Sequence, residues 1–274
     1  MLTEAVRGYR RLMLRRRGFV PDASRDIFLV TYPRSGTTWI SFIAAELMFG
    51  VSPKNLIDID ALVPDVHALP PRSSVPVAHQ YLIKSHLPLT GVPPYGDYRR
   101  VIYLMRDPRD VMLSYYRYSK FHHGYKGDLL AFAMDWCCGR IWPGSWQEHV
   151  NSWLGPRNGS IGLQLNVFRY EDFIGEPIES ASRLARILNV SVSPARLADI
   201  VTNTSAETMR NREAHSPNSS LQFIGPATAG VWESAVHDGK LDAIKIVEEF
   251  AGSAMGRGSY PLFHKNNRAI SIGA

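Results

Sequence analysis

The chain has 274 residues, a formal net charge of +6 at pH 7, and 45% hydrophobic residues. Its length fits one large or two small domains with a real core, and no apolar run approaches the roughly 18 residues of a membrane-spanning helix. Cys137 and Cys138 are adjacent and cannot readily bridge each other, so a reducing, cytoplasmic compartment is expected. No Cys/His group has zinc-site spacing, and the neighbouring His122 and His123 are typical of a solvated loop.

The first 24 residues form a basic segment, and residues 25–274 are expected to form one domain. An amphipathic helix packed on the domain is the simpler reading of this segment, and contact with an anionic membrane surface is the alternative. Without an apolar core or a cleavage site it does not resemble a secretory signal. Because the positive excess is concentrated here, it gives no support for a nucleic-acid partner. The arginines concerned are Arg7, Arg10, Arg11, Arg15, Arg16 and Arg17.

Short runs rich in β-branched and aromatic residues predict four strands, and stretches with helical spacing lie between and after them. Strands separated by helices predict an α/β fold, with a P-loop-like central parallel sheet flanked by helices on both faces. The strands are expected at Ile27–Tyr32, Tyr81–Ser85, Arg100–Met105 and Leu163–Arg169. The helices are expected at Thr37–Phe49, Arg109–Tyr118, Leu129–Cys138, Ser145–Leu154, Ile178–Leu188, Pro194–Val201 and Leu241–Ala251. Loops rich in glycine and proline are expected at 64–76, 88–97 and 214–230.

The turn after the first strand is the strongest functional signal. Gly36 permits a tight turn, and the amides of the helix that follows would point at an anion beside the cation of Arg34. The sequence there is Pro33-Arg34-Ser35-Gly36-Thr37-Thr38-Trp39. It lacks the Gly-Lys-Ser/Thr ending of a Walker A loop, so a phosphate-like ligand is expected rather than ATP with magnesium.

Two further polar clusters follow the next strands, and the carboxyl ends of parallel strands meet at one edge of a sheet. Lys84 and His86 alternate along a strand and project to the same side, where the lysine charge favours a neutral imidazole that can act as a base. The alternative is a surface lysine and a histidine bonded to a loop carbonyl. Arg106 at a strand end and Ser114 two turns into the next helix could reach one phosphate.

Other polar residues in these segments have structural explanations. Asp107, Pro108 and Asp110 fit the N-cap, N1 and N3 positions of a helix. Tyr170 could line a base pocket, whereas Glu171 and Asp172 are interpreted as residues that fix a local turn.

With these segments in order, the region from about residue 26 to 250 resembles the cytosolic-type sulfotransferases, which use 3′-phosphoadenosine 5′-phosphosulfate (PAPS). The resemblance implies that the 33–39 loop binds the 5′-phosphosulfate, that Trp39 stacks on adenine, and that Tyr170 contacts it. By the same resemblance Arg106 and Ser114 bind the 3′-phosphate. His86 corresponds to the general base and Lys84 to the lysine near the transferred group, while Thr204 resembles a further nucleotide-contacting residue more weakly.

The chain departs from that family at three places. Arg34 stands where lysine is most frequent, so its expected role is charge stabilisation. Ala206 stands where an aromatic residue is expected. In the 223–232 segment Gly230 and Trp232 align, but Gly225-Pro226-Ala227 occupies the place of an Arg-Lys-Gly sequence that holds the 3′-phosphate. Arg210 or Arg212 is a candidate replacement.

The expected reaction moves a sulfuryl group from PAPS to a hydroxyl of a small or lipid-like acceptor without a metal, with His86 as base and Arg34 and Lys84 stabilising charge. Two alternatives remain: a small-molecule kinase, which would require magnesium, and a nucleotide-binding protein without catalysis. Aromatic residues between Tyr115 and Trp153 could line the acceptor pocket or belong to the core.

Overall fold

The computed structural model describes residues 22, 24–66, 78–89, 99–155, 162–214 and 228–262. Most of the basic segment 1–24, large parts of the three expected loops, and residues 223–227 lie outside the described residues. Among the helices of the described part, none combines the length and the apolar character needed to cross a membrane.

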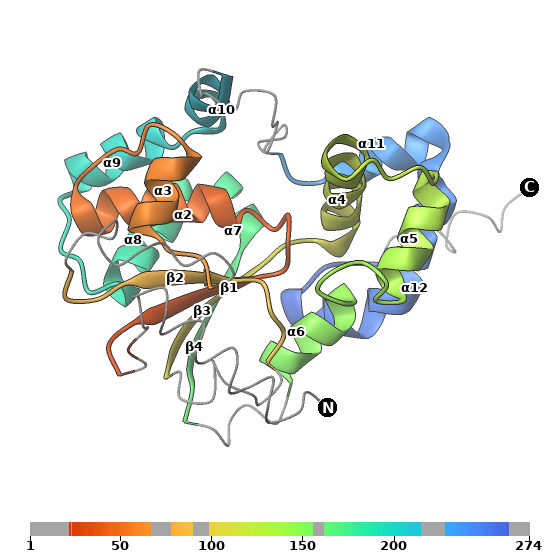
Figure 1. Cartoon of the computed structure of the whole chain (residues 1–274), viewed down its shortest axis with the longest axis horizontal. Helices are drawn as coiled ribbons and strands as arrows, with labels where there is room; N and C mark the ends of the chain where they lie inside the picture. Colours follow the sequence, from red (N-terminus) through yellow and green to blue (C-terminus); the bar gives the residue numbers. More distant parts are fainter. Residues whose placement is uncertain are drawn as a thin grey trace, which may run out of the picture.

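The centre of the fold is a four-stranded parallel sheet with the strand order β2-β1-β3-β4 (Figure 1). The parallel pairing joins Ile27 to Leu82, Phe28 to Val101, and Arg100 to Gln164. The predicted strands and the α/β class are therefore confirmed. The strands are β1 (Ile27–Thr31), β2 (Leu82–Ser85), β3 (Arg100–Met105) and β4 (Gln164–Arg169).

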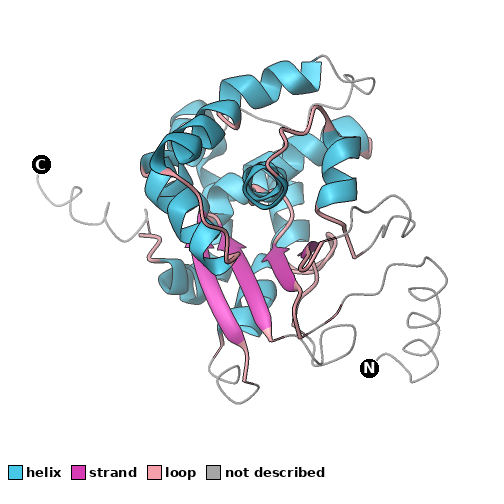
Figure 2. Ribbon diagram, turned by 90° about the vertical axis from the view of Figure 1, so that its left-hand side faces the viewer, coloured by secondary structure: helices cyan, strands magenta, loops and turns pink. Residues whose placement is uncertain are grey.

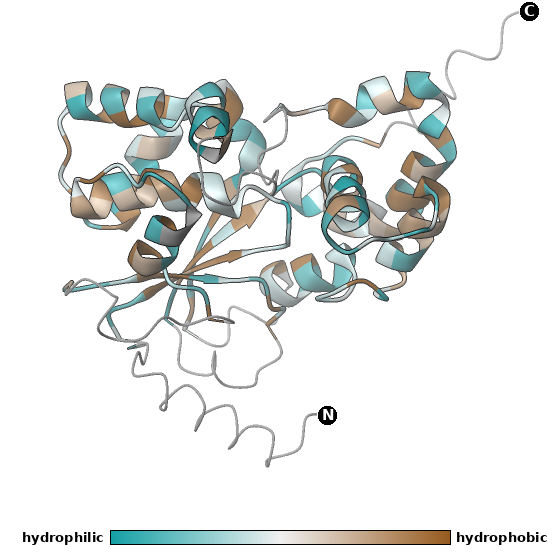
Figure 3. Ribbon diagram, turned by 45° about the horizontal axis from the view of Figure 1, so that its top comes forward, coloured by the Kyte–Doolittle hydropathy of each residue, from teal (hydrophilic) through white to brown (hydrophobic). Residues whose placement is uncertain are grey.

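Side chains alternate between the two faces of the sheet, and each face has its own apolar core. Phe28 and Val30 pack on one face, and Ile27 and Leu29 on the other. The first face is covered by α4 (Pro108–His122), α5 (Leu129–Cys137), α6 (Trp146–Leu154), α11 (Val231–Ala235) and α12 (Leu241–Met255). The second face is covered by α2 (Thr37–Phe49), α3 (Leu56–Leu62), α7 (Tyr170–Gly175), α8 (Pro177–Ile187), α9 (Pro194–Asn203) and α10 (Ala206–Ala214). The two groups of helices lie on opposite sides of the strands (Figure 1), and the strands themselves are mostly hydrophobic (Figure 3).

Four helices were not predicted, and each carries a weak sequence signal. The helices α3, α7 and α11 are one to two turns long, too short for a periodic apolar stripe. The sequence of α10 is largely polar, and among its side chains whose burial the structure describes, Met209 alone is buried, against the second face. These helices form because tertiary contacts stabilise them, which local propensity does not reveal.

The connections determine where a ligand can bind. The chain leaves β1 for helices on the second face and leaves β3 for α4 on the first face, so the direction of winding changes between β1 and β3. In open α/β sheets such a switch point opens a crevice beyond the carboxyl ends of the strands. The described strands point the same way, toward the helices that follow them (Figure 2).

Candidate active site

The turn between β1 and α2 has a strained backbone that leaves helix amides available. Arg34 has φ +70° and Gly36, the N-cap of α2, has φ +103°. Left-handed backbone at a non-glycine residue is uncommon and is found mainly where the surrounding structure imposes it. Gly36 supplies no side-chain cap, so the first-turn N–H groups of α2 are not satisfied in the way that Asp107 satisfies those of α4. Such a helix start is suited to an anion.

Gly36 also permits the close approach of an aromatic ring. A Cβ at this position would lie 2.6 Å from the Tyr170 ring. The Trp39 ring meets Tyr170 edge-on at 5.5 Å between centroids, and the Arg106 guanidinium lies 4.2 Å from the centroid of Tyr170. The loop, the two aromatic rings and Arg106 therefore form one packed unit.

The His86 ring is oriented by Thr31 at the end of β1. Its Nδ1 lies 2.9 Å from the Thr31 carbonyl oxygen and 3.0 Å from the Thr31 hydroxyl. A carbonyl oxygen can only accept, which assigns the hydrogen to Nδ1 and makes Nε2 the basic nitrogen of the neutral ring. The Thr31 hydroxyl in turn lies 2.5 Å from that of Thr37 at the start of α2, so the imidazole is connected to the anion-binding loop.

Lys84 has a partner that the sequence did not indicate. Its ammonium forms an ion pair with Asp60 of α3 at 2.5 Å. The Lys84 side chain is 11% exposed, whereas that of Asp60 is 59% exposed. The strand alternation brings Lys84 and His86 to the same cavity as predicted, but Asp60 offsets the lysine charge there.

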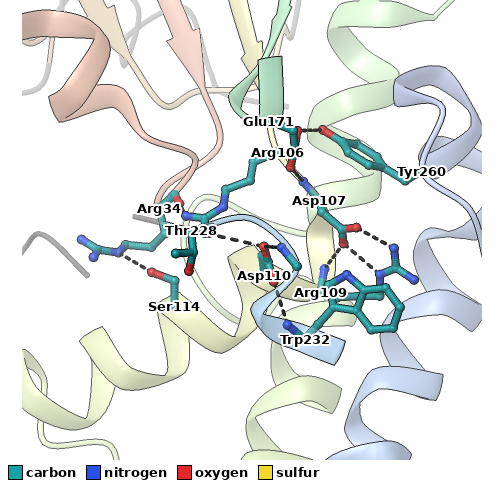
Figure 4. A network of polar contacts seen from close by, with 11 residues as sticks. Arg34, Arg106, Asp107, Arg109, Asp110, Ser114, Glu171, Thr228, Trp232 and Tyr260 are labelled. Carbon is teal, nitrogen blue, oxygen red and sulfur yellow. Dashed lines mark hydrogen bonds and ion pairs between the residues drawn. The ribbon is translucent and has the colours of Figure 1, made fainter. Parts of the chain in front are cut away.

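Arg106 connects three segments beyond the end of β3 (Figure 4). Its guanidinium donates to the carbonyl oxygens of Arg34, at 3.2 Å, and Thr228, at 3.1 Å. The Arg34 Nε donates to the Ser114 hydroxyl at 3.3 Å, and the Arg34 guanidinium lies 4.8 Å from the Tyr118 ring centroid. Arg34, Arg106 and Ser114, which come from separate sequence motifs, thus lie side by side.

The start of α4 holds this arrangement in place. Asp107 caps the helix with Pro108 in its first turn, as predicted. The Asp110 carboxylate accepts the backbone N–H groups of Gly230 and Trp232, both at 2.9 Å, and lies 3.7 Å from Arg106 (Figure 4). Burial raises the Asp110 pKa, while Arg106 opposes that increase. Asp110 therefore fixes the segment that leads into α11.

These groups surround a cavity of about 460 Å³ beyond β1, β2 and β3. Its lining contains every site residue expected from the sequence except Ser35 and Thr204. Thr204 is 1% exposed and its hydroxyl donates to the Ile200 carbonyl at 2.8 Å. The expected residues that do line the cavity are Arg34, Gly36, Thr37, Thr38, Trp39, Lys84, His86, Arg106, Ser114 and Tyr170.

Buried polar atoms without partners mark the same place. Eight buried side-chain polar atoms of the described residues have no hydrogen-bond partner, and Trp39 Nε1 and Arg106 Nε among them belong to residues that line the cavity. Ser35 Oγ, a third, lies in the loop between β1 and α2. Buried polar atoms are normally paired, so the unpartnered atoms of Trp39 and Arg106 fit a polar ligand in the cavity. The same described residues contain no cluster of three or more His, Cys, Asp or Glu side chains that could hold a metal ion.

Some aromatic residues between Tyr115 and Trp153 line the cavity, and others belong to the apolar core. Tyr115, Tyr118 and Trp142 line the cavity, whereas Trp136, Trp146 and Trp153 are buried in the first core. The Tyr115 hydroxyl donates to the Trp142 carbonyl at 2.6 Å, and burial raises the Tyr115 pKa to about 12, so it remains a donor at neutral pH.

Several lining residues were missed by sequence reasoning. Asp60 lies on an unpredicted helix, and Arg117 has the appearance of an ordinary exposed helix residue. The candidates Arg210 and Arg212 do not line the cavity: Arg212 contacts Ser52 and Glu46 instead. The only signal for Arg117 was its spacing from Ser114, one helical turn earlier.

The fold and this cavity define an α/β protein with a cationic cavity, suited to an anionic ligand, at the switch point of its sheet. The sequence matches the family model described as the sulfotransferase domain over residues 24–255. The chain belongs to the sulfotransferase family, as its motifs predicted.

Known relatives cover much of the chain at moderate identity. Mouse sulfotransferase 4A1 is 30% identical over 190 residues, 66% of this chain and 66% of that protein, so the match spans just under two thirds of the relative. The 3-alpha-hydroxysteroid sulfotransferase of Cavia porcellus is 30% identical over 202 residues, 69% of this chain and 67% of its own. The crystal structure of mouse sulfotransferase SULT7A1 complexed with PAP superposes with a TM-score of 0.66 at 19% identity, covering 92% of this chain and 91% of that one, which supports the fold.

Proposed function

We propose that this protein transfers a sulfuryl group from PAPS to the hydroxyl of a small or lipid-like acceptor. The observation that carries the proposal is the meeting of the Arg34–Gly36 turn and His86 in one cavity, within a chain of the sulfotransferase family. A similar fold has been crystallised with PAP, the adenosine 3′,5′-bisphosphate that remains after transfer.

The nucleotide half of the cavity has the chemistry for this donor. The uncapped amides of α2 and Arg34 would bind the 5′-phosphosulfate, and Ser35, whose buried hydroxyl lacks a partner, would donate from behind the loop. Trp39 and Tyr170 would border the adenine. Arg106 and Ser114 would bind the 3′-phosphate.

The proposed chemistry rests on a single proton transfer and on fixed positive charge. His86 Nε2 takes the proton of the acceptor hydroxyl as the acceptor oxygen bonds to sulfur and the bond from sulfur to the bridging phosphate oxygen breaks. Arg34, the loop amides and Lys84 stabilise the negative charge on that leaving oxygen. These cations are proposed to do this without a metal ion.

Lys84 gives a second candidate some support. The ion pair with Asp60 offsets the positive charge of Lys84, so less of that charge is available to stabilise a leaving phosphate. This would suit a protein that binds the nucleotide without catalysis. Under the main proposal, the anionic donor competes with Asp60 for Lys84 when it binds.

Calorimetric titration with PAP, and with ATP plus magnesium, tests the binding half of the proposal. Micromolar binding of PAP that survives EDTA supports it. A preference for ATP with magnesium would favour a kinase, and binding of neither would overturn the proposal.

For the acceptor we propose a hydroxyl compound with an apolar body, because Tyr115, Tyr118 and Trp142 line the cavity and the Trp142 ring contacts that of His86. A relative named for hydroxysteroids is consistent with this class. The expected cytoplasmic location rests on Cys137 and Cys138, which are both unbridged.

A further inference from the structure

Arg117 is a cavity-lining arginine for which the proposed chemistry has no role. It lies on α4 one turn after Ser114, and both residues line the cavity. Within the part of the chain that the structure describes, no hydrogen bond or ion pair engages its guanidinium. Residues three apart on a helix project to the same side, so Arg117 and Ser114 face the same ligand space.

The surroundings of Arg117 carry an excess of positive charge. Arg117 is exposed at the mouth of the cavity, and its partial desolvation together with the nearby Arg106 lowers its pKa, while Asp110 opposes this effect. Asp110 is already engaged by Arg106 and by two backbone N–H groups. Arg34, Arg106 and Arg117 all line the cavity, and Arg106 is linked to the loop after β1 through the Arg34 carbonyl.

The positive charges of Arg106 and Arg117 repel each other, and a dianionic ligand would relieve that repulsion. A terminal phosphate monoester carries close to two negative charges at neutral pH and accepts several hydrogen bonds. A guanidinium can bind such a group through two parallel hydrogen bonds.

We propose that Arg117 is a second guanidinium of the 3′-phosphate site, beside Arg106, and makes the protein select nucleotides that carry this phosphate. The inference rests on the proposed function and deepens it by naming a specificity-determining residue. Arg106 and Ser114 bind the phosphate from the strand end and the helix, and Arg117 binds it from the open side of the cavity.

The test compares two nucleotides that differ only in the 3′-phosphate, PAP and adenosine 5′-monophosphate. Affinities are measured by calorimetry for PAP and by competition against PAP for the monophosphate. Arg117→Ala should weaken PAP binding about tenfold or more, the range of a charged hydrogen bond, and leave monophosphate binding nearly unchanged. Arg117→Lys should recover part of the loss. Lys120→Ala, which removes an exposed cation from the same helix outside the cavity lining, should have little effect.

Three results would overturn the inference. If Arg117→Ala weakens the binding of both nucleotides equally, the residue contributes general electrostatic attraction or structural support and does not select for the 3′-phosphate. If the substitution weakens the binding of neither nucleotide, Arg117 is a solvated surface residue without a role in binding. If wild-type protein binds no PAP at all, the proposed function fails and this inference fails with it, so the two failures are distinguishable.

Discussion

Gly36 precedes α2 and Gly50 follows it, and the two glycines differ in how closely they pack against neighbouring side chains. Both have positive φ, +103° and +66°. A Cβ at Gly36 would collide with Tyr170, whereas a Cβ at Gly50 would meet nothing within 4 Å. Only the first glycine is thus required for packing as well as for backbone conformation.

Gly36→Ala should therefore destabilise the protein more than Gly50→Ala. Both substitutions incur the cost of left-handed backbone, about 1–2 kcal/mol, and Gly36→Ala adds an overpacking cost of about 1–3 kcal/mol. Urea denaturation of the two variants without ligand measures the difference in the free energy of unfolding. Equal losses would mean that the Tyr170 ring moves aside easily.

His86 is expected to act on catalysis and not on binding. His86→Ala should lower kcat by about 10²–10⁴, the usual value of general base catalysis, and leave the Kd for PAP nearly unchanged. Thr31→Val keeps the carbonyl that accepts from Nδ1 and removes only the hydroxyl, so its loss of kcat should be smaller. Equal loss of kcat and of affinity in His86→Ala would indicate a structural role.

At the scale of elements, α6 supports the segment that follows β2. Trp153 Nε1 donates to the Leu87 carbonyl at 3.0 Å, and the Leu89 N–H donates to Ser152 Oγ at 2.9 Å. His149 of the same helix is 1% exposed and lies 2.9 Å from the Tyr103 hydroxyl. The position of His86 at the end of β2 therefore depends on a helix more than sixty residues later in the chain.

Burial, together with the nearby His86, lowers the His149 pKa from 6.5 to about 3. The unfolded chain binds a proton between these values and the native state does not, so the stability from neutral His149 is complete above pH 6.5 and is lost as pH falls toward 3. This histidine should contribute a slope of up to about 1.4 kcal/mol per pH unit to the free energy of unfolding between pH 6 and 4.

His149→Asn should reduce the slope of the free energy of unfolding against pH, whether or not it also changes stability at pH 7. Urea denaturation at several pH values measures this slope. Burial also raises the pKa of Asp110, which opposes the slope in both proteins and so does not affect the comparison. An NMR titration of the wild-type protein gives an independent check. A His149 signal that titrates near pH 6.5 would contradict this explanation.

At the scale of the molecule, local sequence patterns predicted the strands and longer helices better than they predicted the residues that line the cavity. The bounds of α2 agree with the predicted Thr37–Phe49, because a glycine precedes this helix, a glycine follows it, and its interior is strongly apolar. The meeting of the Arg34 turn, His86 and Arg106 also followed from the sequence, since parallel strands end at one edge of the sheet. Asp60 and Arg117 could not be predicted, because their positions depend on how α3 and α4 pack and not on any motif.

The central claim is that this cavity carries out sulfuryl transfer, and the most direct measurement supplies PAPS with radiolabelled sulfate together with a panel of phenols and apolar alcohols. Our account predicts labelled sulfate ester and an equal amount of PAP in the presence of EDTA. If protein that binds PAP labels no acceptor on the panel, or labels one only when magnesium is present, the account is contradicted.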